Sequence, residues 1–517
     1  MTARDVASAV LSGLMLASLF PPFRFDALAW VALVPLLWSL HGKRPHEAVA
    51  LGFLTGLVAY GIIVWWVKLT MVRYGGLHPA LAWLITLLLV VYLAAYAAVF
   101  AGVLVRVCPG GELGMFLLAP PLWVGLELAR AHLFSGFPWA LLGYSQYQVL
   151  PVIQIADLGG VYAVSFFIVL INAAVWHFFR NPHRVPFAVI GGAVLATVLV
   201  LGYGYLRLYE VPRDSGAPSK PVGIVQGNTD QAVKWSPAWQ EAIMAELNQL
   251  TSAVARDLRA KPKGEAPPLI VWPEAAAPFI YADQPRWRER IRRTAREAGA
   301  YLLFGSLAVD RSGERPRLLN SAYLIAPDGR ELGRYDKMQL VPFGEYVPLA
   351  RLLFFVQKLV PVIGTFAAGE EPVIFKANSP GERFGALICF EVIFPHVARR
   401  LREAEYLVNI TNDAWFGRSA ASEQHLSMVA LRAVELRVPI VRAANTGVSA
   451  FIDARGHIRE RSPLFAPWRK SSLIAPRKGP PPLYARTGDV FAFACAAVAL
   501  AAVLAVTARG RRRVWYH

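Results

Sequence analysis

Apolar residues form long, nearly continuous blocks over residues 1–206 and again close to residue 500. Several of these blocks approach the ~20 residues that a helix needs to cross a bilayer. The pattern therefore predicts an α-helical transmembrane bundle of about eight spans, in which the first two blocks are short enough to form a helical hairpin that spans poorly. The blocks lie at roughly 6–20, 27–40, 48–67, 80–105, 114–130, 159–178, 186–206 and 489–508.

The segment between residues 207 and 488 has a different pattern, because its apolar runs are short and are separated by Pro, Gly and charged residues. Runs of strand length lie at 222–225, 269–271, 301–304, 322–325, 386–389, 406–410, 440–443 and 450–452. Residues 237–260 and 420–438 instead repeat apolar positions every three to four residues, which is typical of amphipathic helices. Strands alternating with helices predict an α/β sandwich.

These patterns divide the chain into three parts. Residues 1–206 form the N-terminal bundle of seven helices, residues 207–488 form the α/β domain, and residues 489–517 form a last helix with a basic tail. Only 17% of the 517 residues are charged and 56% are hydrophobic, against roughly 25% and 45–50% in soluble domains. This composition excludes an ordinary soluble enzyme and a disordered chain.

The formal net charge is +18, and its distribution favours a membrane protein over a nucleic-acid binder. Basic residues follow every even-numbered apolar block, as the positive-inside rule requires of cytoplasmic loops. We therefore expect both termini in the cytoplasm, residues 207–488 outside it, and no nucleic-acid partner. The basic residues are Lys43, Arg44, Arg106, Arg180, Arg184, Arg509, Arg511, Arg512 and Arg513; Arg24, Lys68, Arg73 and Arg130 on the other side weaken the asymmetry without reversing it.

Three apolar runs end close to an ionisable residue. They are Leu269-Ile-Val-Trp-Pro-Glu274, Tyr335-Asp-Lys337 and Gly385-Ala-Leu-Ile-Cys389. Taken singly, Glu274 fits a helix start, Lys337 a solvated loop and Cys389 a small core residue. Together they supply a base, a cation and a thiol nucleophile, which are the parts of covalent acyl transfer. A thiol with a pKa near 8.5 needs such a neighbour to lose its proton at neutral pH.

The order and contexts of these residues resemble the carbon–nitrogen hydrolase (nitrilase) superfamily. With the predicted spans, and with the runs at 225–228, 342–348 and 412–417, the chain is similar throughout its length to the bacterial apolipoprotein N-acyltransferase family. The resemblance implies an extracytoplasmic αββα domain on the cytoplasmic (inner) membrane. It also implies roles for ten residues: Glu274 as general base, Lys337 as electrostatic stabiliser, Cys389 as nucleophile, Glu345 and Glu391 as further active-site carboxylates, and Trp235, Phe390, Trp415, Phe354 and Phe355 as substrate-binding aromatics.

The reaction that the resemblance implies is a ping-pong acyl transfer through a thioester on the cysteine. The acyl donor would be a membrane glycerophospholipid, phosphatidylethanolamine by resemblance, and the acceptor the N-terminal amine of a diacylated apolipoprotein. No metal or cofactor is expected. A membrane-tethered amidase or nitrilase that hydrolyses a small C–N substrate would use the same three residues, and a transporter with an external domain would need more charge in its spans.

Two further features have an open interpretation in the sequence. The apolar stretch 348–366, which contains Phe354 and Phe355, is either an arm in the lipid headgroup region or a buried core helix. Glu127 and Arg130, inside an apolar block, are either functional intramembrane charges or side chains that reach the interface from a helix end.

Overall fold

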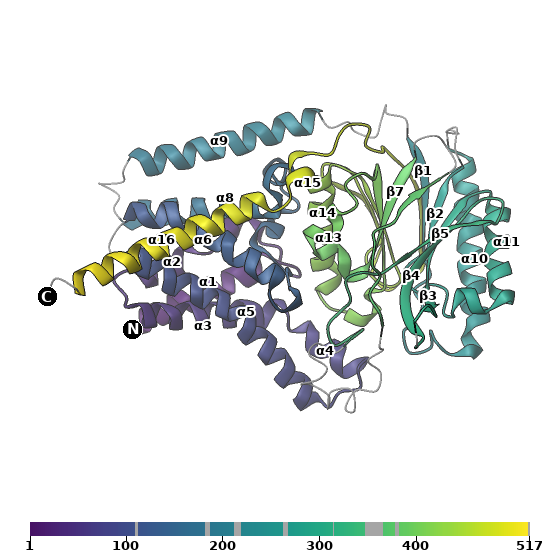
Figure 1. The fold of residues 1–517 in the computed structure, drawn as a ribbon, viewed down its shortest axis with the longest axis horizontal. Coiled ribbons are helices and arrows are strands. Elements are labelled where there is room, and N and C mark those ends of the chain that lie inside the picture. Colours follow the sequence, from purple (N-terminus) through teal and green to yellow (C-terminus); the bar gives the residue numbers. More distant parts are fainter. Residues whose placement is uncertain are drawn as a thin grey trace. The chain divides into compact units, whose positions relative to one another are not determined.

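The computed structural model describes residues 1–108, 112–180, 187–210, 219–261, 267–313, 315–346, 366–377 and 382–514. The chain divides into two compact units (Figure 1). A helical unit comprises residues 1–68, 79–208 and 483–517, and an α/β unit comprises residues 69–78 and 209–482.

The helical unit contains a helix at each predicted apolar block. Its helices are α1 (Ala3–Ser18), α2 (Val34–Leu40), α3 (Pro45–Ile63), α5 (Pro79–Val107), α6 (Glu112–His132), α7 (Leu150–Ile153), α8 (Ala156–Arg180), α9 (Phe187–Glu210), α15 (Leu483–Thr487) and α16 (Val490–Val514), and α4 (Trp66–Arg73) connects to the α/β unit. Short 3₁₀ turns lie at Asp26–Trp30, Leu133–Ser135 and Leu142–Gln146.

Six of the described helices are long and apolar enough to cross a membrane, namely α3, α5, α6, α8, α9 and α16. Helix α1 has 16 residues, and the second block is divided into a 3₁₀ turn and a seven-residue helix. Both are shorter than the ~20 residues that a span requires. The count of eight spans therefore stays a prediction.

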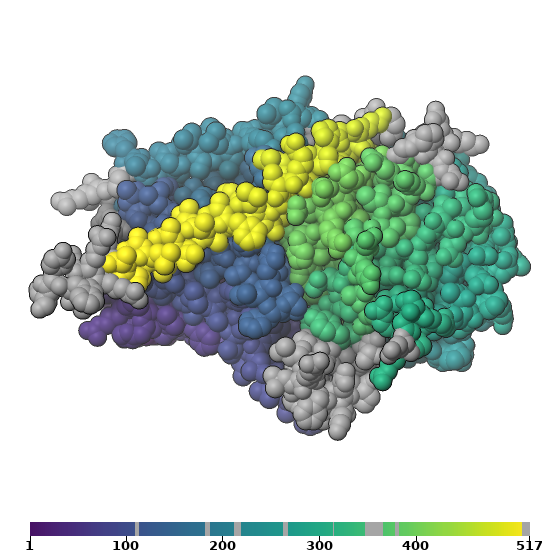
Figure 2. Space-filling model, viewed as in Figure 1, coloured from purple at the N-terminus to yellow at the C-terminus, as the bar shows by residue number. Residues whose placement is uncertain are grey.

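Helix α16 carries large apolar side chains on an open face of the helical unit, where Figure 2 shows it in yellow. Val490, Phe493, Leu500 and Leu504 are each about 60% exposed. Helix α9 is equally open, with only 11% of its most apolar window buried. Apolar surface of this extent on a single helix is typical of a face that contacts lipid.

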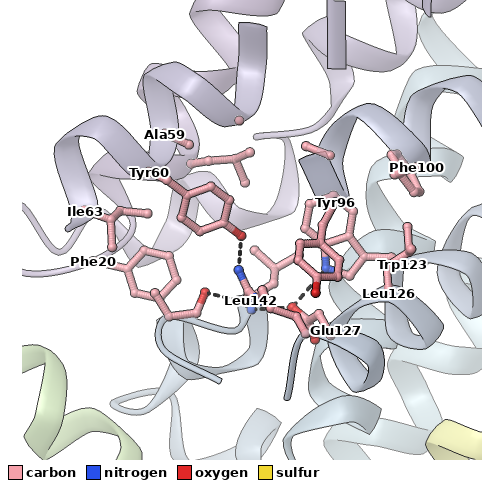
Figure 3. Close-up of a pocket in the computed structure, with 15 residues that line it drawn as sticks. Phe20, Ala59, Tyr60, Ile63, Tyr96, Phe100, Trp123, Leu126, Glu127 and Leu142 are labelled. Carbon is pink, nitrogen blue, oxygen red and sulfur yellow. Dashed lines mark hydrogen bonds between the residues drawn. The ribbon is translucent and has the colours of Figure 1, made fainter. Parts of the chain in front are cut away.

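Glu127 and Arg130 of α6 line a small cavity of about 40 Å³ inside the helical unit (Figure 3). Their side chains are only 5% and 2% exposed. The Glu127 carboxylate accepts hydrogen bonds from Trp123 Nε1 at 3.0 Å and from the Leu142 main-chain N–H at 2.7 Å. Arg130 donates to the Tyr60 hydroxyl. The two charges are therefore internal links between α6, α3 and the turn at Leu142, and their side chains do not extend to the surface of the helical unit.

The α/β unit is built on two six-stranded sheets. The first has the order β12 (Trp468–Ile474), β1 (Lys220–Gln226), β2 (Leu269–Val271), β3 (Tyr301–Asp310), β4 (Arg317–Ile325) and β5 (Glu331–Asp336). The second has the order β11 (Ile458–Arg461), β10 (Ala450–Ile452), β9 (Ile440–Ala444), β8 (Tyr406–Thr411), β7 (Arg383–Ile388) and β6 (Ile374–Lys376).

Each sheet is parallel in its middle, across β1–β2–β3 and across β7–β8–β9, and antiparallel outside it. Helices α10 (Pro237–Arg259) and α11 (Pro285–Ala298) cover the first sheet, and α13 (Pro395–Arg399) and α14 (Ala421–Leu436) cover the second (Figure 1). Strands β1 and β4 contact β9 and β7 of the other sheet. The layers are therefore αββα, as the resemblance predicts.

The sequence pattern missed several elements whose positions are mostly polar. Helix α11 has the sequence Pro-Arg-Trp-Arg-Glu-Arg-Ile-Arg-Arg-Thr-Ala-Arg-Glu-Ala, and it buries only one narrow face, through Trp287, Ile291 and Ala295. Strands β5 and β11 are edge strands of their sheets, and nearly all of their positions are exposed or only partly buried. Such elements lack the apolar density that marks a buried run.

Candidate active site

Glu274 follows β2 by three residues, at the end of a parallel strand in the middle of the first sheet. Its carboxylate is almost buried, and each oxygen has a separate donor. Asn320 Nδ2 donates to Oε1 at 2.7 Å and the Asn412 main-chain N–H donates to Oε2 at 2.7 Å. A Cβ on Gly305 of the neighbouring strand would lie 2.6 Å from the Glu274 Cα, so only glycine allows this close approach. The carboxylate is thus held in one orientation.

Lys337 comes directly after β5 and is 1% exposed. Its Nζ lies 2.8 Å from Glu345 Oε1 and 3.6 Å from Glu274 Oε1. Burial alone would lower the pKa of Lys337, but the charges of Glu345 and Glu274 outweigh burial and raise it above its usual value. The ammonium therefore stays charged over the whole physiological range of pH.

Cys389 is the first residue after β7, and not the last residue of that strand as the apolar run suggests. Its φ of 52° lies in the left-handed region, which costs a residue other than glycine about 1–3 kcal/mol. The side chain is 8% exposed. Burial raises the pKa of the thiol, Glu274 raises it further, and Lys337 lowers it. The resting group is therefore a thiol, whose proton must be removed when it reacts.

Glu345 and Glu391 have different surroundings. Glu345 lies in the site itself, where it accepts hydrogen bonds from Lys337, from Asn320 at 3.1 Å and from the Val341 N–H at 2.8 Å. Glu391 is fully buried. Its carboxylate accepts hydrogen bonds from the Tyr335 hydroxyl and from three main-chain N–H groups, those of Met338, Gln339 and Ile388. Glu391 thus joins the loop after Lys337 to the turn that carries Cys389.

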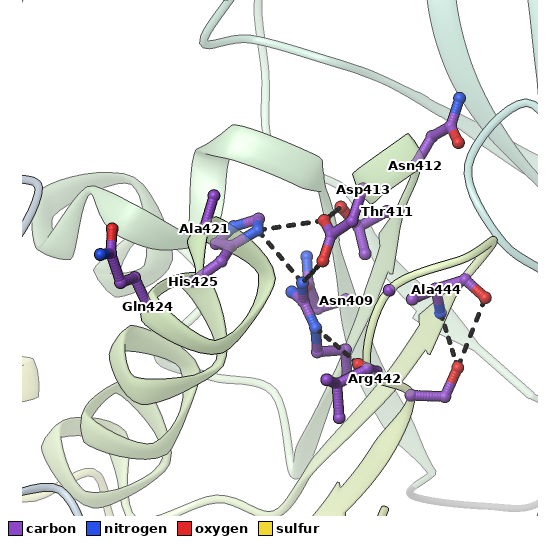
Figure 4. A network of polar contacts seen from close by, with 12 residues as sticks. Asn409, Thr411, Asn412, Asp413, Ala421, Gln424, His425, Arg442 and Ala444 are labelled. Carbon is purple, nitrogen blue, oxygen red and sulfur yellow. Dashed lines mark hydrogen bonds and ion pairs between the residues drawn. The ribbon is translucent and has the colours of Figure 1, made fainter. Parts of the chain in front are cut away.

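A second buried polar network lies at the end of β8 (Figure 4). Asp413 accepts hydrogen bonds from Arg442 Nη2 at 2.8 Å and Thr411 Oγ1 at 2.8 Å, and His425 Nδ1 lies 3.3 Å from it. Burial would raise the pKa of Asp413, but the Arg442 charge lowers it strongly. Burial and Arg442 lower the pKa of His425, so the imidazole is neutral. Asp413 and Arg442 form a charge-balanced pair near Cys389.

The predicted substrate-binding aromatic residues differ in how exposed they are and in what they contact. Trp235 is 42% exposed, and Trp415 packs edge-on against Tyr74 with ring centroids 5.7 Å apart. Phe390 is 7% exposed and packs edge-on against Phe394, which places its ring in the interior. Phe354 and Phe355, with nearly all of the predicted arm, lie outside the described residues, so the arm stays a prediction.

Asn320 and Lys234 were not among the predicted site residues. Asn320 is a polar residue inside the apolar run Leu318-Leu-Asn-Ser-Ala-Tyr-Leu-Ile325, and this interruption is a signal that could have been read. Lys234 precedes a helix in a polar loop, where the sequence pattern is that of a solvated cation. Within the described ranges, no group of three or more His, Cys, Asp or Glu side chains is arranged to hold a metal ion.

The αββα layers with a buried glutamate, lysine and cysteine are those of a carbon–nitrogen hydrolase. Residues 222–473 match the family model of that class. Residues 12–174 match the apolipoprotein N-acyltransferase N-terminal domain. The whole chain belongs to the apolipoprotein N-acyltransferase family. The relative from Geobacter metallireducens is 46% identical over 99% of this chain and 96% of its own length.

More distant relatives are also apolipoprotein N-acyltransferases by name. The apolipoprotein N-acyltransferase of Rhizobium rhizogenes is 33% identical over 87% of this chain and 86% of its own length. That of Haemophilus ducreyi is 30% identical over 89% of this chain and 88% of its own length. The solved structure of an amidase from Nesterenkonia is 17% identical, covers 54% of this chain and 95% of its own, and has a TM-score of 0.37. That likeness is too distant to add to the assignment.

Proposed function

We propose that this protein transfers an acyl chain from a membrane glycerophospholipid to the N-terminal amine of diacylglyceryl-cysteine in apolipoproteins. The observation that carries the proposal is the buried cluster in which Glu274 and Lys337 act on the pKa of Cys389. The apolipoprotein N-acyltransferase of Geobacter metallireducens matches this chain over almost its whole length, which supports the proposal.

In the first half-reaction, Cys389 Sγ attacks the ester carbonyl of the phospholipid while Glu274 takes the thiol proton. The C–S bond forms, the ester C–O bond breaks, and Glu274 passes the proton to the departing glycerol oxygen, which leaves as a lysophospholipid. Negative charge develops on the carbonyl oxygen during this step. Lys337 is the cation placed to stabilise that charge, because its raised pKa keeps it protonated throughout.

In the second half-reaction, the amine of the acceptor attacks the thioester carbonyl. The C–N bond forms, the C–S bond breaks, and Glu274 takes the proton that the amine loses and returns it to the sulfur. A thioester suits this sequence, because it reacts with amines and persists where water is excluded. The near-complete burial of the cluster supports that requirement.

The donor is phosphatidylethanolamine in this proposal, and the α/β unit faces the extracytoplasmic side of a bacterial inner membrane. The distribution of basic residues supports this orientation. Reporters that work on only one side of the membrane test it. A reporter fused after Arg213 should be active outside the cytoplasm and one fused after Arg513 inside it, and the opposite result at either position would contradict the orientation.

Acyl transfer and the alternative, hydrolysis, give different products. Purified protein should convert a phospholipid with a labelled acyl chain and a diacylglyceryl-cysteine peptide into lysophospholipid and N-acyl peptide in equal amounts. Release of labelled free fatty acid without acylation of the peptide would indicate a hydrolase. Replacing phosphatidylethanolamine by phosphatidylglycerol should slow the reaction, and equal rates would contradict the donor preference.

A further inference from the structure

Lys234 is a buried lysine on the loop between β1 and α10, and the reaction described above does not use it. Its side chain is 1% exposed, although the next residue, Trp235, is 42% exposed. The Nζ donates a hydrogen bond to the main-chain oxygen of Glu274 at 3.3 Å. Among the described residues this is its one hydrogen-bond acceptor, for a group with three donor hydrogens. Such an ammonium is costly to bury.

The loop that carries Lys234 is joined to Glu274 by a second route as well. Asn445 exchanges hydrogen bonds with Thr229 of this loop, through its Oδ1 at 2.9 Å and its Nδ2 at 2.8 Å. The same Asn445 donates to Asn412 Oδ1 at 3.0 Å, and the Asn412 N–H donates to the Glu274 carboxylate. The loop is therefore linked to Glu274 in two ways. Lys234 contacts the main-chain oxygen of Glu274 directly, and Thr229 is linked to the carboxylate of Glu274 through two asparagines.

Lys234 adds a positive charge next to two carboxylates that share one other cation. Glu274 and Glu345 carry two negative charges and Lys337 carries one positive charge. Asp413 is already balanced by Arg442, His425 is neutral, and Glu391 faces hydrogen-bond donors of its own. Glu274 is the ionisable group that acts on Lys234, and its charge partly opposes the effect of burial. The ammonium of Lys234 thus supplies a second positive charge close to Glu274.

We propose that Lys234 is a positioning residue for Glu274, which fixes the turn that carries the general base and places a positive charge beside it. The proposal rests on the proposed role of Glu274. Burial lowers the pKa of Lys234 to about 8, so its charge is lost at mildly alkaline pH, at which Lys337 remains charged. Above about pH 8 the rate at which Cys389 reacts should therefore rise less steeply with pH than it does when the charge at this position does not titrate.

The test measures alkylation of Cys389 by iodoacetamide between pH 6 and pH 10 in the full-length protein, read by peptide mass spectrometry. Lys234→Met should slow alkylation at pH 7 by about tenfold or more, because a base that is no longer held in place is less often in reach of the thiol. Lys234→Arg keeps a charge that does not titrate, so its rate should keep rising through pH 8, where the native rate should rise less steeply. Lys220→Met, which removes another buried lysine of the α/β unit, is the matched control and should leave the rate unchanged.

Thermal melting separates this role from a purely structural one. The lowered pKa of Lys234 means that its burial costs stability below about pH 8, and the cost disappears as the pH rises toward 10.5. Lys234→Met should therefore melt at or above the native temperature at pH 7. A native alkylation rate and pH profile in Lys234→Met, or slowing that accompanies a lower melting temperature, would overturn the proposal. Because alkylation needs no lipid, its outcome is independent of whether the acyl transfer itself occurs.

Discussion

Replacing Lys337 with methionine removes the cation that lies between the two carboxylates of the site. Its Nζ is 2.8 Å from Glu345 and 3.6 Å from Glu274, and the methionine side chain fills a similar volume without charge. Among the described residues, the side-chain amide of Asn320 is then the one hydrogen-bond donor that both carboxylates share. The variant therefore leaves two carboxylates next to each other without the cation that they contact in the native protein.

The size of the effect follows from these distances. At an effective dielectric constant of about 20, each contact is worth roughly 4.5–6 kcal/mol before the cost of desolvation. Removing one partner from a buried ion pair typically destabilises a protein by about 3–5 kcal/mol. The raised pKa of Lys337 means that its contribution is complete below about pH 10.5 and is lost only as the pH rises further. The variant should therefore melt at a lower temperature at every pH below that value.

The assay is the pH dependence of Cys389 alkylation in the full-length protein. Lys337 lowers the pKa of the thiol, so its removal should shift the alkaline rise in alkylation to higher pH. Peptide mapping separates this thiol from Cys108 and Cys495, which are also buried. Acyl transfer should fall by 10²–10³-fold, roughly the effect of losing one preorganised group that stabilises developing charge.

Lys220→Met again serves as the control, because Lys220 Nζ lies 2.7 Å from Glu382 and the pair is nearly buried. It should destabilise the α/β unit without moving the alkylation profile. If Lys337→Met alkylates at the native rate with the native pH dependence, or if Lys220→Met moves the profile equally, the electrostatic role of Lys337 would be refuted.

Three further changes test other parts of the site. Glu274→Gln keeps the shape but removes the base, so alkylation of the thiol and acyl transfer should slow by roughly 10²–10⁴-fold; unchanged rates would transfer the role of base to Glu345. Asn320→Asp places a third carboxylate beside Glu274 and Glu345, so the activity of the variant, divided by that of the native protein, should be low at pH 7 and should recover as the pH falls toward 5. A ratio of the two activities that does not change with pH would contradict this. Changing Phe354 and Phe355 to Ser should slow turnover of bilayer lipid while a short-chain soluble ester still acylates the thiol, whereas a lower melting temperature with equal loss on both substrates would reject the membrane arm.

Much of the site could be predicted because reacting groups at strand ends leave a local signal. Glu274, Lys337 and Cys389 each follow an apolar run, and the two sheets bring them into one buried cluster. The α/β sandwich followed from the alternation of short runs and amphipathic helices, and the αββα order of its layers followed from the family resemblance. The missed helix α11 shows the limit of that reasoning, since its buried stripe is hidden among arginines and glutamates.

Features that depend on distant parts of the chain could not be predicted in this way. Burial of Lys234 results from packing against a segment forty residues away, and the pairing of Arg442 with Asp413 spans 29 residues. The inward position of Glu127 and Arg130 likewise depends on contacts with the turn at Leu142 and with Tyr60, which a hydropathy pattern does not contain. The number of spans depends on two short apolar blocks whose lengths are marginal.

The central claim is that Cys389 carries the acyl chain as a thioester. The most direct measurement is intact-protein mass spectrometry after incubation with a phospholipid of defined acyl chains and no acceptor. The account predicts a mass increase of one acyl chain on Cys389, which neutral hydroxylamine removes, which a diacylglyceryl-cysteine peptide discharges, and which is absent from Cys389→Ala. An acyl adduct that still forms in Cys389→Ala, or lysophospholipid released without any adduct on the native protein, would contradict it.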